Sequence, residues 1–231
     1  MRVVLALLVA AACARGAPSA GSVGDLRAGY SGNLARLAKA RGRLAVRLAQ
    51  ADAPRAAVLA EAGDLLIDAL RRDILPAWAG TPWDFNGTTR VPGEGRIACG
   101  HYVAGILDDA GFRVERRRLG QQASELIIRT LVPESEIRRF RQGDVGAVVD
   151  AVAAGPRAIY LIGLDTHAGL LVHADGAVVF CHASYLSGAV LCEDARSSPA
   201  MRSRYHVIGR LSNDRTLAGW LAGQPWPTLT R

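Results

Sequence analysis

The chain has 231 residues, of which 50% are hydrophobic, 21% are charged and only 6% are aromatic. This composition is that of an ordinary globular protein and excludes a disordered or collagen-like chain. The formal net charge of +7 rests almost wholly on arginine, since Lys39 is the only lysine. The arginines are scattered, with no basic stripe that has interleaved aromatics, so we expect no nucleic acid among the partners.

Residues 1–20 have the pattern of a secretory signal peptide: Arg2, an apolar run over residues 3–12, then small residues. The run is too short to span a bilayer as a helix, which needs roughly 18 apolar residues. Cys13 after three alanines is similar to the lipidated cysteine of a bacterial lipobox, and cleavage after Ala14 or Ala20 is the alternative. We therefore predict export to the periplasm or cell envelope, with membrane attachment only through a lipid at Cys13.

Residues 21–76 are expected to form a flexible lead-in and a helical hairpin. Residues 18–32 are rich in Gly, Ser and Ala, which favours a flexible segment. From Asn33 on, leucines recur at helical spacing, and Asp52-Ala53-Pro54 begins a second helix that we expect Pro76 to end. The two antiparallel helices either pack on the body of the protein, which we favour, or form a separate partner-binding module.

The next segment leads to a cysteine at a predicted helix start. Residues 80–96 hold too many turn-forming residues for a helix or a long strand, so we predict an ordered loop. Periodicity then indicates a helix over residues 99–110 that begins at Cys99 and has Gly111 as its C-terminal cap. A thiol there faces the positive end of the helix dipole, which lowers its pKa and favours the nucleophilic thiolate. The backbone amide of Cys99 also faces outward and can stabilise an oxyanion.

The rest of residues 77–231 is predicted to complete one α+β domain with a C-terminal antiparallel sheet. Helices are expected over residues 122–131 and 133–141. Strands are expected over residues 158–163, 167–173, 177–183, 189–192 and 205–211. Asn213 and Asp214 cap a last short helix that reaches Leu221.

The register of one predicted hairpin shows which histidines can contact each other. Asp175-Gly176 between two aliphatic runs predicts a type I′ turn, in which the numbers of paired residues sum to 351. His182 then lies opposite Gly169. His167 is the diagonal neighbour of His182 at roughly 7–8 Å on the same face, whereas His173 lies near the turn. Of these three histidines, only His167 and His182 can form a pair.

The cysteines beyond residue 20 are Cys99, Cys181 and Cys192. Cys181 faces away from the histidine pair and could bond to Cys192 across neighbouring strands, although two buried free cysteines are the more common arrangement. Cys99, His167 and His182 supply a nucleophile, a base and a group that orients the base. These are the parts of a cysteine hydrolase triad.

Four segments at these residues resemble the NlpC/P60 family of papain-like cysteine peptidases. The chain has Gly-Thr-Pro-Trp where the family has Gly-Thr-Pro-Tyr, and Ile-Ala-Cys-Gly around Cys99 where the family has Asp-Cys-Ser-Gly. His-Ala-Gly-Leu, which begins at His167, corresponds to the family's His-Val-Gly. Phe-Cys-His-Ala-Ser around His182 corresponds to its Phe-Val-His-Ala-Ser. The resemblance spans residues 80–184. Ala98 and Gly100 replace the family's Asp and Ser beside the nucleophile.

The resemblance implies a papain-like fold, in which a nucleophile helix packs on an antiparallel sheet, and it implies no cofactor. By position, Cys99 is the nucleophile, His167 the general base and His182 the orienting residue. Trp83 replaces a tyrosine that lines the family's site, so we expect it to contact substrate. Gln122, with Gln121 before it, could donate to an oxyanion or simply cap the following helix.

The implied function is hydrolysis of amide bonds in peptidoglycan stem peptides through a thioacyl enzyme, by an exported protein that we expect to be a monomer. A non-catalytic envelope protein that binds cell-wall peptide in the same groove is one alternative. A zinc site is another, because Cys and His are zinc ligands. The Cys/His/His set lacks the Cys-x-x-Cys or His-Glu-x-x-His spacing of such sites, so we predict no metal.

Overall fold

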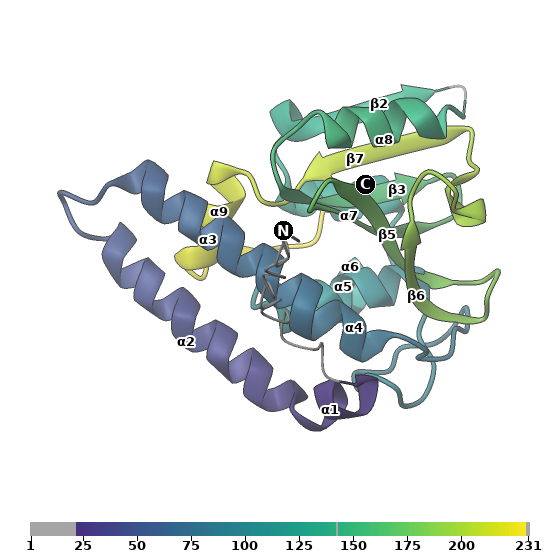
Figure 1. The fold of residues 1–231 in the computed structure, drawn as a ribbon, viewed down its shortest axis with the longest axis horizontal. Coiled ribbons are helices and arrows are strands. Elements are labelled where there is room, and N and C mark those ends of the chain that lie inside the picture. Colours follow the sequence, from purple (N-terminus) through teal and green to yellow (C-terminus); the bar gives the residue numbers. More distant parts are fainter. Residues whose placement is uncertain (1–21, 142, 230–231) are drawn as a thin grey trace, which may run out of the picture.

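The computed structural model describes residues 22–141 and 143–229 (Figure 1). The predicted signal peptide and Cys13 lie outside these residues. Helices combine with an antiparallel six-stranded sheet, so the fold is α+β as predicted. No helix in the described ranges is long and apolar enough to cross a membrane.

The six-stranded sheet has the order β2-β7-β3-β4-β5-β6, and all neighbouring strands are antiparallel. Its strands are β2 (Ile137–Arg141), β3 (Ala158–Leu164), β4 (Ala168–Ala174), β5 (Ala177–Ser184), β6 (Ala189–Asp194) and β7 (Tyr205–Arg210). A parallel pair of β1 (Arg113–Val114) and β8 (Pro225–Trp226) forms a second, small sheet. The five predicted strands are confirmed to within two residues at each end.

The β4–β5 hairpin has the predicted register. Asp175 and Gly176 both have positive φ, at 52° and 76°, as a type I′ turn requires. His173 pairs with Val178 and Leu170 with Cys181, so the paired numbers sum to 351. Because a strand's register decides which side chains share a face, this turn fixes the face on which the histidines lie.

The helices surround the sheet (Figure 1). They are α1 (Val23–Ala28), α2 (Tyr30–Leu48), α3 (Arg55–Ala69), the π-helical turn η1 (Leu70–Ile74), α4 (Leu75–Trp78), α5 (Cys99–Asp109), α6 (Arg116–Leu119), α7 (Ser124–Leu131), α8 (Val145–Ala153) and α9 (Asp214–Leu221). α5 packs on β4 and β5, and α7 packs on β3 and β7. α8 packs on the opposite face, where Val148 and Val152 join a second apolar cluster with Tyr160 and Phe180.

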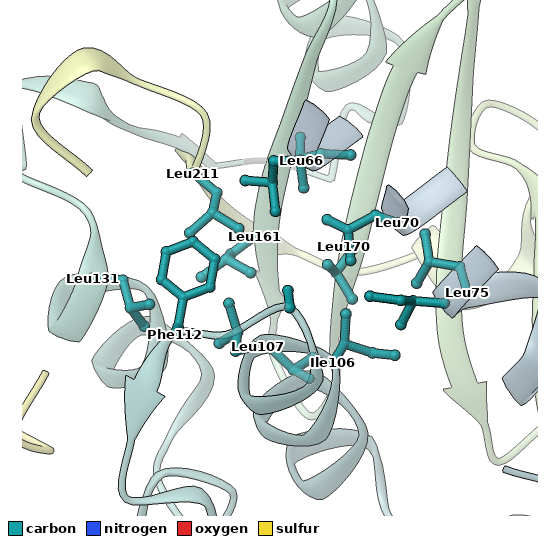
Figure 2. Packing of buried hydrophobic residues seen from close by; sticks show 14 of the residues in the cluster. Leu66, Leu70, Leu75, Ile106, Leu107, Phe112, Leu131, Leu161, Leu170 and Leu211 are labelled. Carbon is teal, nitrogen blue, oxygen red and sulfur yellow. The ribbon is translucent and has the colours of Figure 1, made fainter. Parts of the chain in front are cut away.

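The helical hairpin of α2 and α3 packs on the body of the protein, as favoured from the sequence. Leu66 and Leu70 lie in the same apolar cluster as Leu107 of α5 and Leu161 of β3. Figure 2 shows these side chains meeting between the hairpin, α5 and the sheet. The hairpin therefore shares one core with the rest of the molecule.

Two predictions at the N-terminal helices are wrong. From Ser22 on, the predicted lead-in is helical, because Ser22 and Asp25 form a capping box that begins α1. Pro76 does not end the second helix, which continues through η1 and α4 to Trp78. The π-helical turn η1 ends at Ile74, so Pro76 lies in the first turn of α4. A proline is tolerated there, because the first amides of a helix have no acceptor within it.

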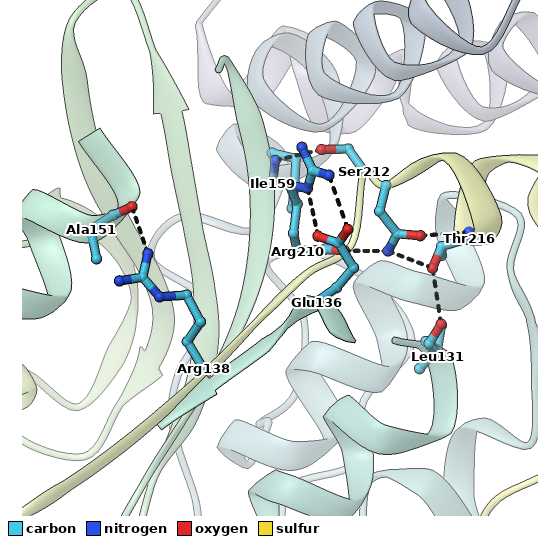
Figure 3. Close-up of polar contacts among 9 residues, drawn as sticks. Leu131, Glu136, Arg138, Ala151, Ile159, Arg210, Ser212 and Thr216 are labelled. Carbon is cyan, nitrogen blue, oxygen red and sulfur yellow. Dashed lines mark hydrogen bonds and ion pairs between the residues drawn. The ribbon is translucent and has the colours of Figure 1, made fainter. Parts of the chain in front are cut away.

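The helix predicted over residues 133–141 is also wrong. Glu134–Glu136 form a 3-10 turn, and Ile137–Arg141 form the edge strand β2, which pairs with β7. Glu136 accepts two hydrogen bonds from Arg210, and Arg138 donates to a carbonyl of α8 (Figure 3). α8 itself was not predicted, although Asp144 caps it by accepting from the Ala147 amide. The β2–β7 pairing and the Glu136–Arg210 contacts join residues about 70 positions apart in the chain, so local spacing does not reveal them.

Candidate active site

Cys99 is the first residue of α5, as predicted, and Ala98 occupies the N-cap position in extended conformation. The N–H groups of Cys99 and Gly100 have no acceptor within the helix, because the first four amides of a helix lack one. The preceding loop holds this end in place, since the Ile97 amide donates to the Pro82 carbonyl and the Ala98 amide to the Gly87 carbonyl, both at 2.9 Å. The thiol is thereby held at a fixed point beside the sheet.

Gly100 departs from the serine of the resembling family, and the structure gives a physical reason. A Cβ atom at Gly100 would collide with the carbonyl oxygen of Gly120, which follows α6. The start of α5 therefore lies too close to this backbone for any side chain. Glycine at this position permits the close packing that brings α6 and the following residues to the site.

A cleft of about 680 Å³ opens beside Cys99, where β3 ends, β4 begins and β5 ends. Cys99 and His167 both line it, as do the predicted substrate contacts Trp83 and Gln122. The Trp83 ring lies 6.2 Å from that of Tyr185, which also lines the cleft. Four of the five predicted site residues thus surround one cavity.

His167 contacts His182, as predicted. Nε2 of His167 lies 2.7 Å from Nδ1 of His182, and the ring centroids are 4.9 Å apart. Both rings are buried, with exposed fractions of 5% and 0%. A Cβ atom at Gly169 would lie 2.8 Å from the Cys181 carbonyl oxygen and 3.1 Å from Cβ of His182, so glycine is needed there to leave room. His182 is therefore held behind the histidine that lines the cleft.

Glu193 of β6 joins this pair, although it was not predicted as a site residue. Its Oε1 atom lies 3.1 Å from Nε2 of His182, and the Ser198 hydroxyl donates to the same oxygen. Phe180, which pairs with Glu193 across the two strands, stacks on the His182 ring with centroids 4.1 Å apart. The register of the next hairpin, in which Phe180 faces Glu193, is the sequence signal that could have found this contact.

Burial determines the charge of the site. It raises the pKa of the Cys99 thiol, and the backbone amides of Ala168, Gly100 and Cys99 only partly offset this effect. Burial, with a smaller effect of His182, lowers the pKa of His167 to about 3. Burial also lowers the pKa of His182, against the opposing effect of Glu193. The predicted depression of the thiol pKa is therefore wrong: desolvation outweighs the helix N-terminus, and the resting site holds a neutral thiol and neutral imidazoles.

The thiol and the imidazole share the cleft without a direct bond. Within residues 22–141 and 143–229, no hydrogen bond joins the Cys99 thiol to a histidine ring, and the thiol interacts instead with the amide of Ala168, the residue after His167. Catalytic hydrogen bonds are often long in substrate-free sites and shorten in the complex. The absence of this bond between Cys99 and the histidines is therefore compatible with a thiol–imidazole pair.

Two further polar residues that line the cleft, Gln122 and Asp165, have structural partners. The side-chain amide of Gln122 donates to the Arg118 carbonyl at 3.0 Å and thereby caps the C-terminal end of α6. Asp165 accepts from the Arg204 amide at 2.9 Å and ties the β3–β4 turn to the start of β7. His173 and His206 contact backbone carbonyl oxygens away from the cleft, at 3.0 and 2.8 Å.

Cys181 and Cys192 lie opposite each other on β5 and β6 and form a disulfide, so the favoured prediction of two free cysteines is wrong. Cys181 faces the apolar cluster under α5, on the face of the sheet opposite the histidines, as predicted. Among the described residues, Cys99 is the free cysteine. In the same part of the chain, no group of three or more His, Cys, Asp or Glu side chains is arranged to hold a metal ion.

Comparisons with known protein families, with curated proteins and with solved structures find no match.

Proposed function

We propose that the protein is an exported cysteine hydrolase with a papain-like, NlpC/P60-type fold that cleaves amide bonds in peptidoglycan stem peptides. The observation that carries this proposal is the 2.7 Å contact between His167 and His182 at a cleft lined by Cys99. A nucleophile, a base and a group that orients the base thus come from the first residue of α5, the residue before β4, and β5. The packing of α5 on the antiparallel sheet and the resemblance over residues 80–184 support the same conclusion.

In the first step of the proposed reaction, the substrate carbonyl carbon approaches Sγ of Cys99. His167 takes the thiol proton as the C–S bond forms and an electron pair moves onto the carbonyl oxygen. The outward N–H groups of Cys99 and Gly100 donate to this oxyanion. The C–N bond then breaks, and the His167 imidazolium gives its proton to the leaving amine, which leaves a thioester on Cys99.

In the second step, water attacks the thioester while His167 takes its proton. The C–S bond breaks, a carboxylic acid leaves, and the Cys99 thiolate recovers the proton from His167. The low pKa of His167 keeps this base neutral throughout the physiological pH range. It also makes the transient imidazolium a strong acid, which favours proton transfer to the leaving amine.

The walls of the cleft and the charge of the chain support a peptide of the cell wall as substrate. Trp83 and Tyr185 form an aromatic wall, and Phe85 at the rim is 79% exposed. Such side chains supply apolar contact area for a peptide backbone or side chain. The net charge of +7, which becomes +5 when Arg2 and Arg15 are removed with residues 1–20, attracts an anionic cell-wall polymer.

A non-catalytic peptide-binding protein is the second candidate. The raised pKa of Cys99 favours it, because a neutral thiol is a weak nucleophile. In this case the cleft holds the same peptide and no thioester forms.

Mass spectrometry of muropeptides separates the two functions. Purified peptidoglycan is incubated with the protein, with Cys99→Ala, and with His173→Ala as a matched control outside the cleft. The hydrolase predicts new stem-peptide fragments with the wild type and the control but none with Cys99→Ala. Identical products from all three samples contradict it, and equal binding of intact muropeptides by wild type and Cys99→Ala then favours the binding protein.

A further inference from the structure

Glu193 and Ser198 stand behind the histidine pair, and neither lines the cleft. His182, which connects them to the cleft, is fully buried, and Ser198 is 3% exposed. The chain of contacts runs from Ser198 to Glu193, then to His182 at 3.1 Å and to His167 at 2.7 Å. The Glu193 side chain itself is 28% exposed. Hydrogen-bonded polar chains of this kind determine where their protons lie.

These contacts determine which nitrogen of each ring carries a proton. Oε1 of Glu193 accepts from the Ser198 hydroxyl, and because a carboxylate has no proton to donate it also accepts from His182, so Nε2 of His182 is an N–H group. A neutral imidazole has one N–H, so Nδ1 of His182 is an acceptor. The 2.7 Å contact then requires Nε2 of His167 to donate. Nδ1 of His167 is left with a lone pair, which makes it the nitrogen that can accept a proton.

We propose that Glu193, held by Ser198, is a positioning residue that keeps His167 in the tautomer able to accept the Cys99 proton. Its catalytic consequence rests on the proposed function, whereas the tautomer does not. Without an acceptor at position 193, His182 can carry its proton on Nδ1 and donate it to Nε2 of His167. His167 then carries a proton on Nδ1 and cannot act as the base.

The expected loss of kcat can be estimated from serine hydrolases, in which a carboxylate also orients the catalytic histidine. In serine hydrolases, the loss of the carboxylate that orients the catalytic histidine lowers kcat by about 10⁴ through the wrong tautomer. Glu193 acts through one more imidazole, and the wrong tautomer competes with the right one rather than replacing it. We therefore expect Glu193→Leu to lower kcat by roughly 10 to 100-fold with little change in KM. Glu193→Gln places an amide beside His182 whose N–H group can donate to Nε2, which is the carboxylate-to-amide change that favours the wrong tautomer in serine hydrolases, so we expect a similar loss.

The decisive measurement is ¹⁵N NMR of the histidine rings at neutral pH, which distinguishes the two tautomers directly. The samples are wild type, Glu193→Leu, Glu193→Gln and Ser198→Ala, with Asp194→Asn as a control for a neighbouring carboxylate. We expect Nε2–H tautomers for His167 and His182 in the wild type and the control. Glu193→Leu and Glu193→Gln should shift both rings toward Nδ1–H, and Ser198→Ala should shift them less. Thermal unfolding of each variant verifies that it is folded.

The readouts separate this inference from the hydrolase proposal. Unchanged tautomers in folded Glu193→Leu overturn the positioning role, whatever the activity. If that variant does not fold, Ser198→Ala decides, and unchanged tautomers there overturn the role equally. A tautomer shift together with a loss of kcat on muropeptides supports both proposals. A tautomer shift in a protein whose wild type cleaves nothing supports the positioning role and rejects the hydrolase.

Discussion

At the scale of single residues, desolvation and hydrogen bonding compete for the charge on Cys99. Burial raises its pKa despite three backbone amides that favour the thiolate. Because the thiolate is the reactive form, we expect iodoacetamide to alkylate Cys99 slowly at pH 7 and faster as the pH rises past 9. Mass spectrometry of the Cys99 peptide from pH 6 to 10 measures this rate. A rate that has already levelled off below pH 8 would show that the helix start dominates after all.

A second prediction at this scale concerns how His167 makes the free energy of unfolding depend on pH. Its pKa is about 3 in the folded protein and about 6.5 in the unfolded chain, so the unfolded chain binds more protons between these values. Its contribution is fully present above about pH 6.5 and is lost as the pH falls toward 3. Between pH 6.5 and 5 the wild type should lose up to about 2 kcal/mol, and His167→Gln should lose less.

Urea unfolding at several pH values tests this difference. His173→Gln is the matched control, because His173 lies away from the cleft and contacts a backbone carbonyl oxygen. Its stability should follow the wild type with pH. The prediction fails when His167→Gln shows the same slope as the other two proteins.

At the scale of elements, the disulfide ties β5 to the edge strand β6, which carries Glu193. Its two cysteines are 11 residues apart, and closing a loop of that length stabilises a protein by about 2–3 kcal/mol. We expect the double variant Cys181→Ala/Cys192→Ala to lose this amount in urea unfolding. Cys99→Ala, which keeps the disulfide, should lose less. Equal stability of the double variant and the wild type would contradict the disulfide.

The elements that could be predicted from sequence are those determined by local contacts. Asp175-Gly176 sets the register of β4 and β5, so the contact between His167 and His182 followed from the turn. The edge strand β2 could not be predicted, because its partner β7 lies about 70 residues further on and Ile137 pairs with Gly209. Figure 3 shows the Glu136–Arg210 contact that accompanies this pairing.

The same division applies to the candidate site. Its residues follow from local patterns, whereas their charges depend on packing. The position of Cys99 came from helical periodicity and a terminal glycine. Its raised pKa arises from burial under segments distant in sequence, and the Glu193 contact needs the register of one more strand.

At the scale of the whole molecule, the helical hairpin belongs to the core. Leu66 and Leu70 are fully buried and pack beside Ile106 and Leu107 of α5, the helix that carries Cys99 (Figure 2). A polar connection accompanies this packing, since the Tyr30 hydroxyl donates to Asp109 at the end of α5 at 2.6 Å. The hairpin thus packs directly on both α5 and the sheet.

We therefore expect that a protein without residues 22–76 does not fold, and that its remaining residues do not form a stable domain. The deletion exposes the apolar sides of α5 and of the sheet, and an apolar surface of that kind leads to loss of fixed packing or to aggregation. Near-UV circular dichroism and size-exclusion chromatography measure both. Val46→Ser, at an α2 position that is 68% exposed, is the control and should leave thermal unfolding unchanged. A deletion variant that unfolds cooperatively would mean that residues 77–229 hold a sufficient core of their own, since cooperative unfolding requires native packing that persists without the hairpin.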